Sequence, residues 1–217
     1  MKFDIITIFP QLFDSFKNEA LMKRAQKNKI VSVDTHFLRD QAIDKRGTVD
    51  DRPYGGGVGM VLMFEPIYKT LKKIKKKKKS KVIVFNPKGK KFTQAMAREW
   101  AKLDQLIMIC GRYEGIDERV MAELADEEIS IGDYVLFGGE VPAMVVVEAV
   151  TRLLPGAVGK QESVLNESFS VNENNLEYPH YTRPEVIKFG KKKLSVPEVL
   201  LSGDHKKIEE WRKKMSK

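Results

Sequence analysis

Three apolar runs of the sequence end in glycine-rich turns, and these turns are the segments best suited to hold a ligand. The runs are residues 82–85, 107–110 and 134–137, and each is too short for a helix, which predicts a buried strand. Glycine lets backbone N–H and C=O groups approach a ligand closely, and ligands of α/β sheets lie beyond the carboxyl ends of the strands. Three such turns predict one pocket for a nucleotide-sized molecule. The alternative is that these glycines only make tight turns between strands and helices.

Each predicted strand is followed by a segment with helical apolar spacing. These segments are residues 93–103, 116–124 and 142–154, and Pro142 suits the first turn of the last of them. Strands are also predicted at 3–9 and 31–38, with a helix between them at 12–25. This alternation predicts the α/β fold class. No G-x-G-x-x-G follows a strand and no G-x-x-x-x-G-K-[ST] occurs, so neither an ordinary dinucleotide site nor a P-loop is expected.

A second candidate ligand segment is the loop at residues 47–63, GTVDDRPYGGGVGMVLM. It combines acidic, basic and aromatic side chains with glycines, which suits a loop that moulds itself to a ligand. An ordinary flexible hairpin is the alternative interpretation. The residues of interest are Asp50, Arg52, Tyr54, Gly55 and Gly56.

The composition indicates a globular protein without a metal or disulfide framework. A chain of 217 residues with 42% hydrophobic content can bury a core, and its length suits one domain plus a small appendage. No apolar run is long enough to span a bilayer, and Asp4 interrupts the apolar start, so a cytoplasmic protein is expected. The single cysteine, Cys110, excludes an internal disulfide and is expected to pack in a strand. The lone His36 is expected on a strand face, and no metal site is predicted.

The formal net charge of +9 is unevenly distributed. Residues 69–91 hold 12 lysines and no acid, and residues 183–217 hold 11 lysines and arginines against 5 acids. Clustered basic charge favours a polyanion such as RNA, because neutralised phosphates release counterions. The simplest interpretation of the lysine run at 72–81 is a solvated loop. The C-terminal segment is the stronger candidate for RNA, and it includes a predicted helix at 204–214 with Asp204 as N-cap.

Four longer strings of the sequence resemble one known family. The strings CGRYEGIDERV, SIGDYVL-GGE-PAM, DDRPYGGGVGM and PHYTRPEV closely resemble the bacterial tRNA (guanine-N1) methyltransferases, the TrmD family of the SPOUT methyltransferases, and the resemblance extends over residues 3–211. It implies methylation of N1 of the guanosine at tRNA position 37, just 3′ of the anticodon, which supports reading-frame maintenance. S-adenosylmethionine is the implied methyl donor, and Mg²⁺ is left open as a second cofactor.

The resemblance also implies an architecture that periodicity alone does not predict. It implies a SPOUT-type α/β sheet with a deep C-terminal trefoil knot, followed by a small helical C-terminal domain. The expected divisions are a catalytic domain at 1–158, an interdomain linker at 159–179 and a short basic tRNA-binding domain at 180–217. Members usually continue for a few helical turns past the Trp-Arg pair at 211–212 and use that extension to grip the anticodon arm. An obligate homodimer with a shared active site is implied as well.

Site residues follow from the resemblance position by position. The implied base is Glu167, where the family has an aspartate, and Arg152 is implied to steady O6 of the guanine. The implied cofactor-binding residues are Val84, Phe85, Pro87, Gly89, Gly111, Tyr113, Glu114, Gly115, Ile131, Gly132, Tyr134, Leu136, Gly138, Gly139 and Pro142. The implied substrate-binding residues are Asp50, Arg52, Tyr54, Gly55, Gly56, His180, Tyr181 and Arg183.

Three functions remain open from the sequence. The first is this tRNA methyltransferase, the second is another SPOUT enzyme that acts on ribosomal RNA, and the third is a catalytically silent RNA-binding protein that keeps the cofactor fold. The long motif matches favour the first over the second. Glutamate at 167 and the short C-terminus are the features that favour the third.

Overall fold

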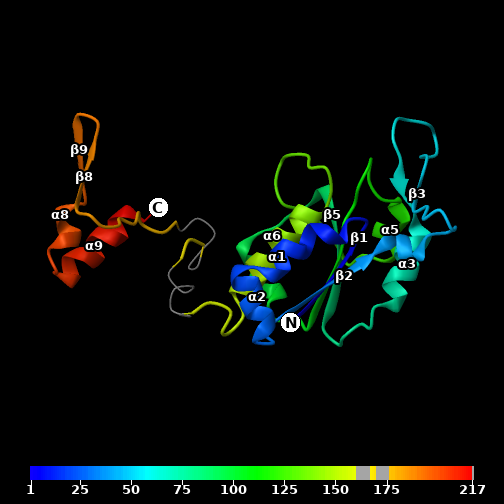
Figure 1. Cartoon of the computed structure of the whole chain (residues 1–217), viewed down its shortest axis with the longest axis horizontal. Helices are drawn as coiled ribbons and strands as arrows, with labels where there is room; N and C mark the ends of the chain where they lie inside the picture. The colour runs from blue at the N-terminus through cyan, green and yellow to red at the C-terminus, as the bar shows by residue number, and fades with distance from the viewer. Residues whose placement is uncertain (160–166, 170–175, 217) are drawn as a thin grey trace. The chain divides into compact units, whose positions relative to one another are not determined.

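The chain folds into two compact units in a computed structural model, Met1–Gly159 and Lys160–Lys217 (Figure 1). The structure describes residues 1–159, 167–169 and 176–216.

The N-terminal unit is built on a five-stranded sheet in the order β2-β1-β6-β5-β7. All four neighbouring pairs run parallel. The predicted α/β class is therefore confirmed, and its sheet is parallel. The strands are β1 Lys2–Thr7, β2 Ser32–Phe37, β5 Ser80–Lys91, β6 Gln105–Ile109 and β7 Glu127–Ser130.

Helices cover both faces of this sheet, which is why its central strands are apolar on both sides (Figure 1). One face packs against α1 Asp14–Asn18, α2 Ala20–Lys27, α4 Gln94–Trp100 and α6 Glu140–Arg152. The other packs against α3 Phe64–Lys73 and α5 Glu118–Glu123. Short connections complete the unit: η1 Pro10–Phe13, η2 Leu38–Gln41, β3 Asp50–Asp51 and β4 Val61–Leu62.

The prediction of a strand at 134–137 is wrong. These residues belong to an irregular loop in which Val135 is 85% and Phe137 is 94% exposed. The last strand of the sheet is β7, whose sequence EEIS carries two acids. Both acids of this edge strand have partners on the neighbouring strand β5: Lys81 bonds Glu127, and Asn86 donates to Glu128 Oε2 over 3.0 Å.

The helix predicted at 12–25 is not continuous. The segment divides into η1, α1 and α2, with Glu19 extended and Ala20 at φ +44°. Nothing in the local sequence marks this break. The other predicted helices are confirmed with shifted ends, and α6 begins at Glu140, two residues before Pro142.

The described residues of the C-terminal unit form a β-hairpin and two helices. Its elements are β8 Val186–Phe189, β9 Lys192–Ser195, α8 Glu198–Leu201 and α9 His205–Met215. The predicted N-cap is confirmed, since Asp204 Oδ1 accepts hydrogen bonds from the backbone of Lys206 and Lys207 at 3.1 and 3.2 Å. The hairpin was not predicted from the sequence. Among the described residues, no helix is both long enough and apolar enough to cross a membrane.

Candidate active site

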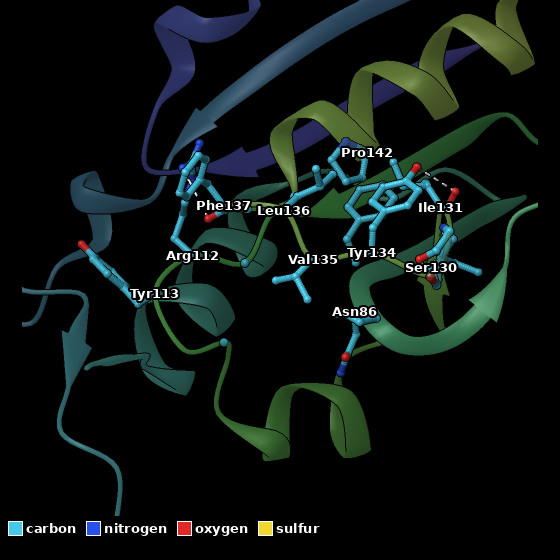
Figure 2. Close-up of a pocket in the computed structure, with 18 of the residues that line it drawn as sticks. Asn86, Arg112, Tyr113, Ser130, Ile131, Tyr134, Val135, Leu136, Phe137 and Pro142 are labelled. Atoms are coloured by element: carbon cyan, nitrogen blue, oxygen red, sulfur yellow. Dashed lines mark hydrogen bonds between the residues drawn. The ribbon is translucent and has the colours of Figure 1, made fainter. Parts of the chain in front are cut away.

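A cavity opens beside the middle of β5, where β6 and β7 end (Figure 2). Its wall is formed by residues 85–87 within β5, at the shift in its register with β7, by the loops at 111–115 and 131–139, and by the start of α6. All predicted cofactor-binding residues line this cavity except Val84 and Gly89. The three segments that the sequence singled out therefore converge on one space, although the turn predicted at 86–89 is wrong because β5 continues to Lys91. Their ligand contacts stay a prediction.

Val84 and Gly89 lie elsewhere. Val84 is fully buried in the core beneath α3 and α5. A Cβ atom at Gly89 would lie 2.5 Å from the carbonyl carbon of Glu128. Glycine at 89 thus lets the second half of β5 pass close to β7, which is a packing role.

Glycine is required at positions 138 and 139 because neighbouring atoms leave no room for a Cβ atom, and not because of a positive φ. The backbone N–H of Gly139 donates to the carbonyl of Gly111 over 3.0 Å. A Cβ at Gly139 would lie 2.7 Å from Cys110 Cα, and one at Gly138 would lie 2.4 Å from Arg112 Nε. The chain that follows β7 is thereby held directly against the end of β6. Burial raises the pKa of the Cys110 thiol, and the nearby carboxylate of Glu140 adds to the effect.

An ion pair that sequence reasoning missed connects these two loops. Glu140 is 1% exposed, and its Oε2 accepts from Arg112 Nε over 2.9 Å while its Oε1 accepts from Thr7 Oγ1 over 2.7 Å. The Arg112 guanidinium also lies 4.7 Å from the ring centroid of Phe9 and donates to the carbonyl of Phe137. Arginine after one strand-end glycine and glutamate after another was the available signal in the sequence. The pair fixes the loop at 131–139 relative to the loop at 111–115.

The cavity wall combines apolar side chains with accessible backbone. Figure 2 shows Tyr134, Leu136 and Pro142 grouped on one side, with Tyr113 directed away from them. The Tyr134 hydroxyl donates to the carbonyl of Ile131 over 3.1 Å, while the Tyr113 hydroxyl accepts from Arg39. Apolar walls with a few fixed polar groups suit a flat ring such as a nucleobase. Other wall residues that the sequence did not single out are Asn86, Ile129, Ser130, Val135 and Phe137.

The glycine-rich loop lies beside this cavity. Leu62 N donates to Gly115 O, and Glu114 N donates to Met60 O, both over 3.0 Å. A Cβ at Gly59 would lie 2.6 Å from Glu114 Cγ, so glycine is needed for this close approach. The structure thus brings the end of the loop to the turn at 111–115 on the cavity wall.

The predicted substrate-binding residues of this loop are placed on its β3 strand and on the turn after it. Asp50 lies on β3, and Arg52 and Tyr54 follow with exposed side chains. Gly55 and Gly56 have φ of +85° and +82°, a backbone region that glycine adopts without strain. The tip of the loop is therefore accessible to a second ligand, and its role stays a prediction.

The two predicted catalytic residues belong to different units. Arg152 is the last residue of α6 in the N-terminal unit and lines a hollow shared with Ser15, Leu21, Glu148 and Thr151. Glu167 belongs to the C-terminal unit. Their joint action on one substrate stays a prediction.

The remaining predicted substrate residues lie in the C-terminal unit beside an aromatic cluster. His180 Nε2 lies 3.0 Å from Glu177 Oε1, and the ring centroid of Tyr181 lies 6.4 Å from that of Trp211. Arg183 is exposed. The cation that contacts this cluster is Arg212, whose guanidinium lies 4.9 Å from the ring centroid of Tyr178. Cations and aromatic rings together suit phosphates and bases.

His36 and Asp4 form a structural contact away from the cavity. His36 Nε2 lies 2.7 Å from Asp4 Oδ1, and Asp4 is fully buried on β1. Burial alone would raise the pKa of Asp4, but hydrogen bonds from His36, Lys2 and Gln105 outweigh it, so the pKa is lowered. Within the described residues, no three His, Cys, Asp or Glu side chains gather as metal ligands do.

Comparison with known proteins adds a match over the full chain. The family model described as tRNA (Guanine-1)-methyltransferase TrmD matches residues 1–217. A tRNA (guanine-N(1)-)-methyltransferase of Carboxydothermus hydrogenoformans is 51% identical over 216 residues, which cover 100% of this chain and 83% of that protein. Proteins of the same name from Ruminiclostridium cellulolyticum and Clostridioides difficile are 50% and 47% identical, and the matches cover 100% of this chain and 91% and 92% of theirs.

Proposed function

The chain belongs to the TrmD family of tRNA (guanine-1)-methyltransferases, and on that premise we propose that it methylates N1 of guanosine in tRNA with S-adenosylmethionine as methyl donor. The target is the guanosine at position 37, just 3′ of the anticodon, and the product supports reading-frame maintenance. The observation that carries the proposal is the convergence of residues 85–87 in the middle of β5 with the loops at 111–115 and 131–139, which follow the neighbouring strands β6 and β7. The family match supplies the reaction.

Two features of the cavity suit S-adenosylmethionine: the backbone and apolar groups of its wall, and the glycines that keep side chains out of it. Backbone groups of the loops at 111–115 and 131–139 suit the polar edge of an adenine, while Tyr134, Leu136 and Pro142 suit its faces. S-adenosylmethionine supplies an electrophilic methyl group on a sulfonium. The glycines at 111, 138 and 139 keep side chains out of the space where loops and ligand meet.

Transfer to N1 requires that its proton leave and that negative charge on O6 be stabilised. Glu167 accepts the N1 proton, and the Arg152 guanidinium steadies O6 as the charge develops. A glutamate in place of aspartate keeps the carboxylate and moves its oxygens by roughly a bond length, which matters because a misplacement on the order of 1 Å can cost ~100-fold in rate. The loop at 50–56 holds the guanine base.

A trefoil knot accounts for the contact between the chain after β7 and the end of β6. The support is the hydrogen bond from Gly139 N to Gly111 O and the close approach to Cys110 Cα described above. A chain that returns to this position after forming an outer strand has the path that a knot of the SPOUT type requires.

A second copy of the chain completes the active site. Val141 and Val145 stand one turn apart on α6 with 56% and 42% of their surface exposed, and α6 contacts η1, where Leu12 and the preceding Phe9 are also exposed. A contiguous apolar surface of this kind on a globular unit marks an interaction site. The homodimer lets the linker of one subunit close the cofactor pocket of the other.

The C-terminal unit binds tRNA through phosphates. Lys191, Lys192 and Lys193 lie in the turn and second strand of the β8–β9 hairpin, and Phe189 beside them is 72% exposed. Lysines suit phosphates as point charges, and an exposed aromatic ring suits a base. Mg²⁺ is a candidate second cofactor, for which Glu114 on the cavity wall offers one carboxylate, since Mg²⁺ often takes one or two carboxylates with substrate oxygens and water.

Mapping of methylated nucleosides tests the reaction. Unmodified tRNA incubated with the protein and S-adenosylmethionine should yield 1-methylguanosine at position 37. Methylation only of ribosomal RNA, or no methylation of either RNA, contradicts the proposal.

Variants at position 167 test the assigned base. Glu167→Gln should lower the single-turnover rate by ~100-fold or more, the usual size of a general-base contribution, while calorimetry shows unchanged binding of S-adenosylmethionine. Glu167→Asp, which keeps the carboxylate, should stay active and serves as the matched control. If Glu167→Gln reacts at the parental rate, another group is the base, and Asp50 is the next candidate.

A further inference from the structure

The edge of the sheet opposite the cavity is strongly basic. In a parallel sheet all loops that precede strands meet at one edge, and in residues 1–159 these loops are 28–31, 74–79, 101–104 and 124–126, together with the chain start. We name their positive groups the basic edge. It comprises the Met1 amine, Lys29, Lys75, Lys76, Lys77, Lys78, Lys79 and Lys102, against the two carboxylates Asp104 and Asp126 in the same loops. Figure 1 shows the chain start and the loop after α3 on the same side of the sheet.

The lysine loop at 74–79 is held in a defined position. The side chain of Gln105, which is fully buried, accepts from Lys77 N over 2.8 Å and donates to Lys75 O over 3.3 Å. Gln105 also donates to the buried Asp4 Oδ2 over 2.7 Å, so the loop is tied into the sheet. At its far end Asp104 N donates to Lys79 O over 2.9 Å. The loop is anchored at three points, so its backbone loses little conformational entropy when a ligand binds to its side chains. A freely moving loop would lose more.

The positive charges of this loop lack compensation. Other lysines of the unit pair with acids, as Lys69 does with Glu65 and Lys91 does with Asp133. In residues 1–159 no carboxylate lies within ion-pair distance of the five side chains at 75–79. The pKa of the Met1 amine is lowered, first by its burial and next by the positive charge of Lys77. Binding of an external polyanion would reduce the electrostatic repulsion within such a cluster of positive charges.

We propose that the basic edge binds the phosphodiester backbone of RNA, at a part of the RNA away from the nucleotide held at the cavity. Strands of five to six residues separate the two edges of the sheet by roughly 17–20 Å, so one RNA can reach both. RNA is favoured over an anionic membrane because Ile74, the apolar residue inside the lysine run, is buried and offers nothing to insert into lipid. The choice of RNA as ligand rests on the proposed function.

The test compares two triple variants with the same change in net charge. The first is Lys76→Gln/Lys77→Gln/Lys78→Gln. The control is Lys23→Gln/Lys45→Gln/Lys69→Gln, three exposed lysines outside the basic edge. Both lower the formal net charge by three from its value of +9, so a difference between them reports position and not total charge. The anchoring hydrogen bonds of the loop use backbone atoms and survive the first substitution.

Binding of tRNA is measured over a salt titration. If the three lysines contact phosphates, the slope of log K against log salt should decrease by about 2 to 3 relative to the control, because each phosphate contact contributes ~0.7 to 0.9. Affinity at low salt should fall about 10-fold or more, and KM for tRNA should rise with kcat unchanged. Equal slopes and affinities for the two variants overturn the proposal.

Two further arms separate other outcomes. A short hairpin that carries only the target loop and its stem should bind both variants equally if the contact is to a remote part of the RNA, and a loss with this hairpin as well overturns that placement. The affinity of the first triple variant for vesicles of anionic lipid is measured as well. If this variant binds tRNA as well as the control does but no longer binds the vesicles, the proposal is overturned. Absence of methylation by the parental protein would instead reject the proposed function, which the binding comparison does not need.

Discussion

The contact between Arg112 and Glu140 gives a stability prediction that follows from burial alone. Glu140 is 1% exposed and holds two hydrogen bonds, from Arg112 and from Thr7. Arg112→Met removes the guanidinium and leaves a buried carboxylate with the Thr7 hydroxyl as its remaining side-chain partner. Breaking a buried ion pair from one side costs about 3–5 kcal/mol of folding free energy, because the remaining charge is uncompensated.

The converse change should cost less. The side chain of Arg112 is 20% exposed, so after Glu140→Gln the guanidinium can still be hydrated, and the amide oxygen of the substituted side chain can still accept from Thr7. A loss of about 1–3 kcal/mol is expected, the range for an impaired buried hydrogen bond. The double variant Arg112→Met/Glu140→Leu should be more stable than Arg112→Met alone, because it removes the stranded charge.

Urea unfolding at neutral pH measures these differences, provided the m-values agree. Arg119→Met is the matched control, since Arg119 also pairs with an acid, Asp117, but is 71% exposed, so its loss should have little effect. Equal destabilisation by Arg112→Met and Arg119→Met would refute the reasoning. So would a double variant Arg112→Met/Glu140→Leu that is no more stable than Arg112→Met alone.

Two further predictions concern packing and pH. Gly139→Ala should abolish binding of S-adenosylmethionine in calorimetry, because its Cβ would lie 2.7 Å from Cys110 Cα, whereas Gly159→Ala, with no atom within 4 Å of the new Cβ, should bind normally. The lowered pKa of Asp4 means that its contribution to stability is complete above its unfolded pKa of about 3.9 and is lost as pH falls through the folded value. Asp4→Asn should therefore be destabilising at pH 7, and the deficit relative to the parental protein should shrink in unfolding measurements below about pH 4. Asp34→Asn, which removes an exposed partner of the same Lys2, should show little of either effect; a constant deficit for Asp4→Asn would contradict the assignment.

The parallel sheet could be predicted because its central strands are buried on both faces. The runs at 82–85 and 107–110 are apolar without alternation, and they became the centre of the sheet. Glycine at a strand end is also a local signal, and it marked the turn after β6, whereas the turn predicted at 86–89 is instead part of β5. The cofactor-binding residues implied by the resemblance line the cavity apart from Val84 and Gly89, whose surroundings are set by packing, and their contacts with a cofactor stay a prediction.

Contacts between distant residues were not predictable from local patterns. Thr7 and Glu140 are separated by 133 positions, and Arg112 and Glu140 by 28. Nothing in the neighbourhood of Glu140 shows that it will be buried, since glutamate at the start of a helix normally suits the helix dipole at the surface. Its burial follows from the path of the chain after β7, which depends on the tertiary fold.

The misassigned strand at 134–137 has a physical explanation that bears on function. The segment YVLF satisfies the pattern of a buried strand, yet Val135 and Phe137 are almost fully exposed in the single chain. Local hydrophobic signals and burial are expected to disagree mainly at functional sites, because a folded chain otherwise buries such runs. Leu136 and Tyr134 face the cavity, and Phe137 adjoins the Arg112 contact near the exposed Phe9. The proposed cofactor and the proposed second copy of the chain would together cover this apolar run, so its exposure in the single chain agrees with the proposed function.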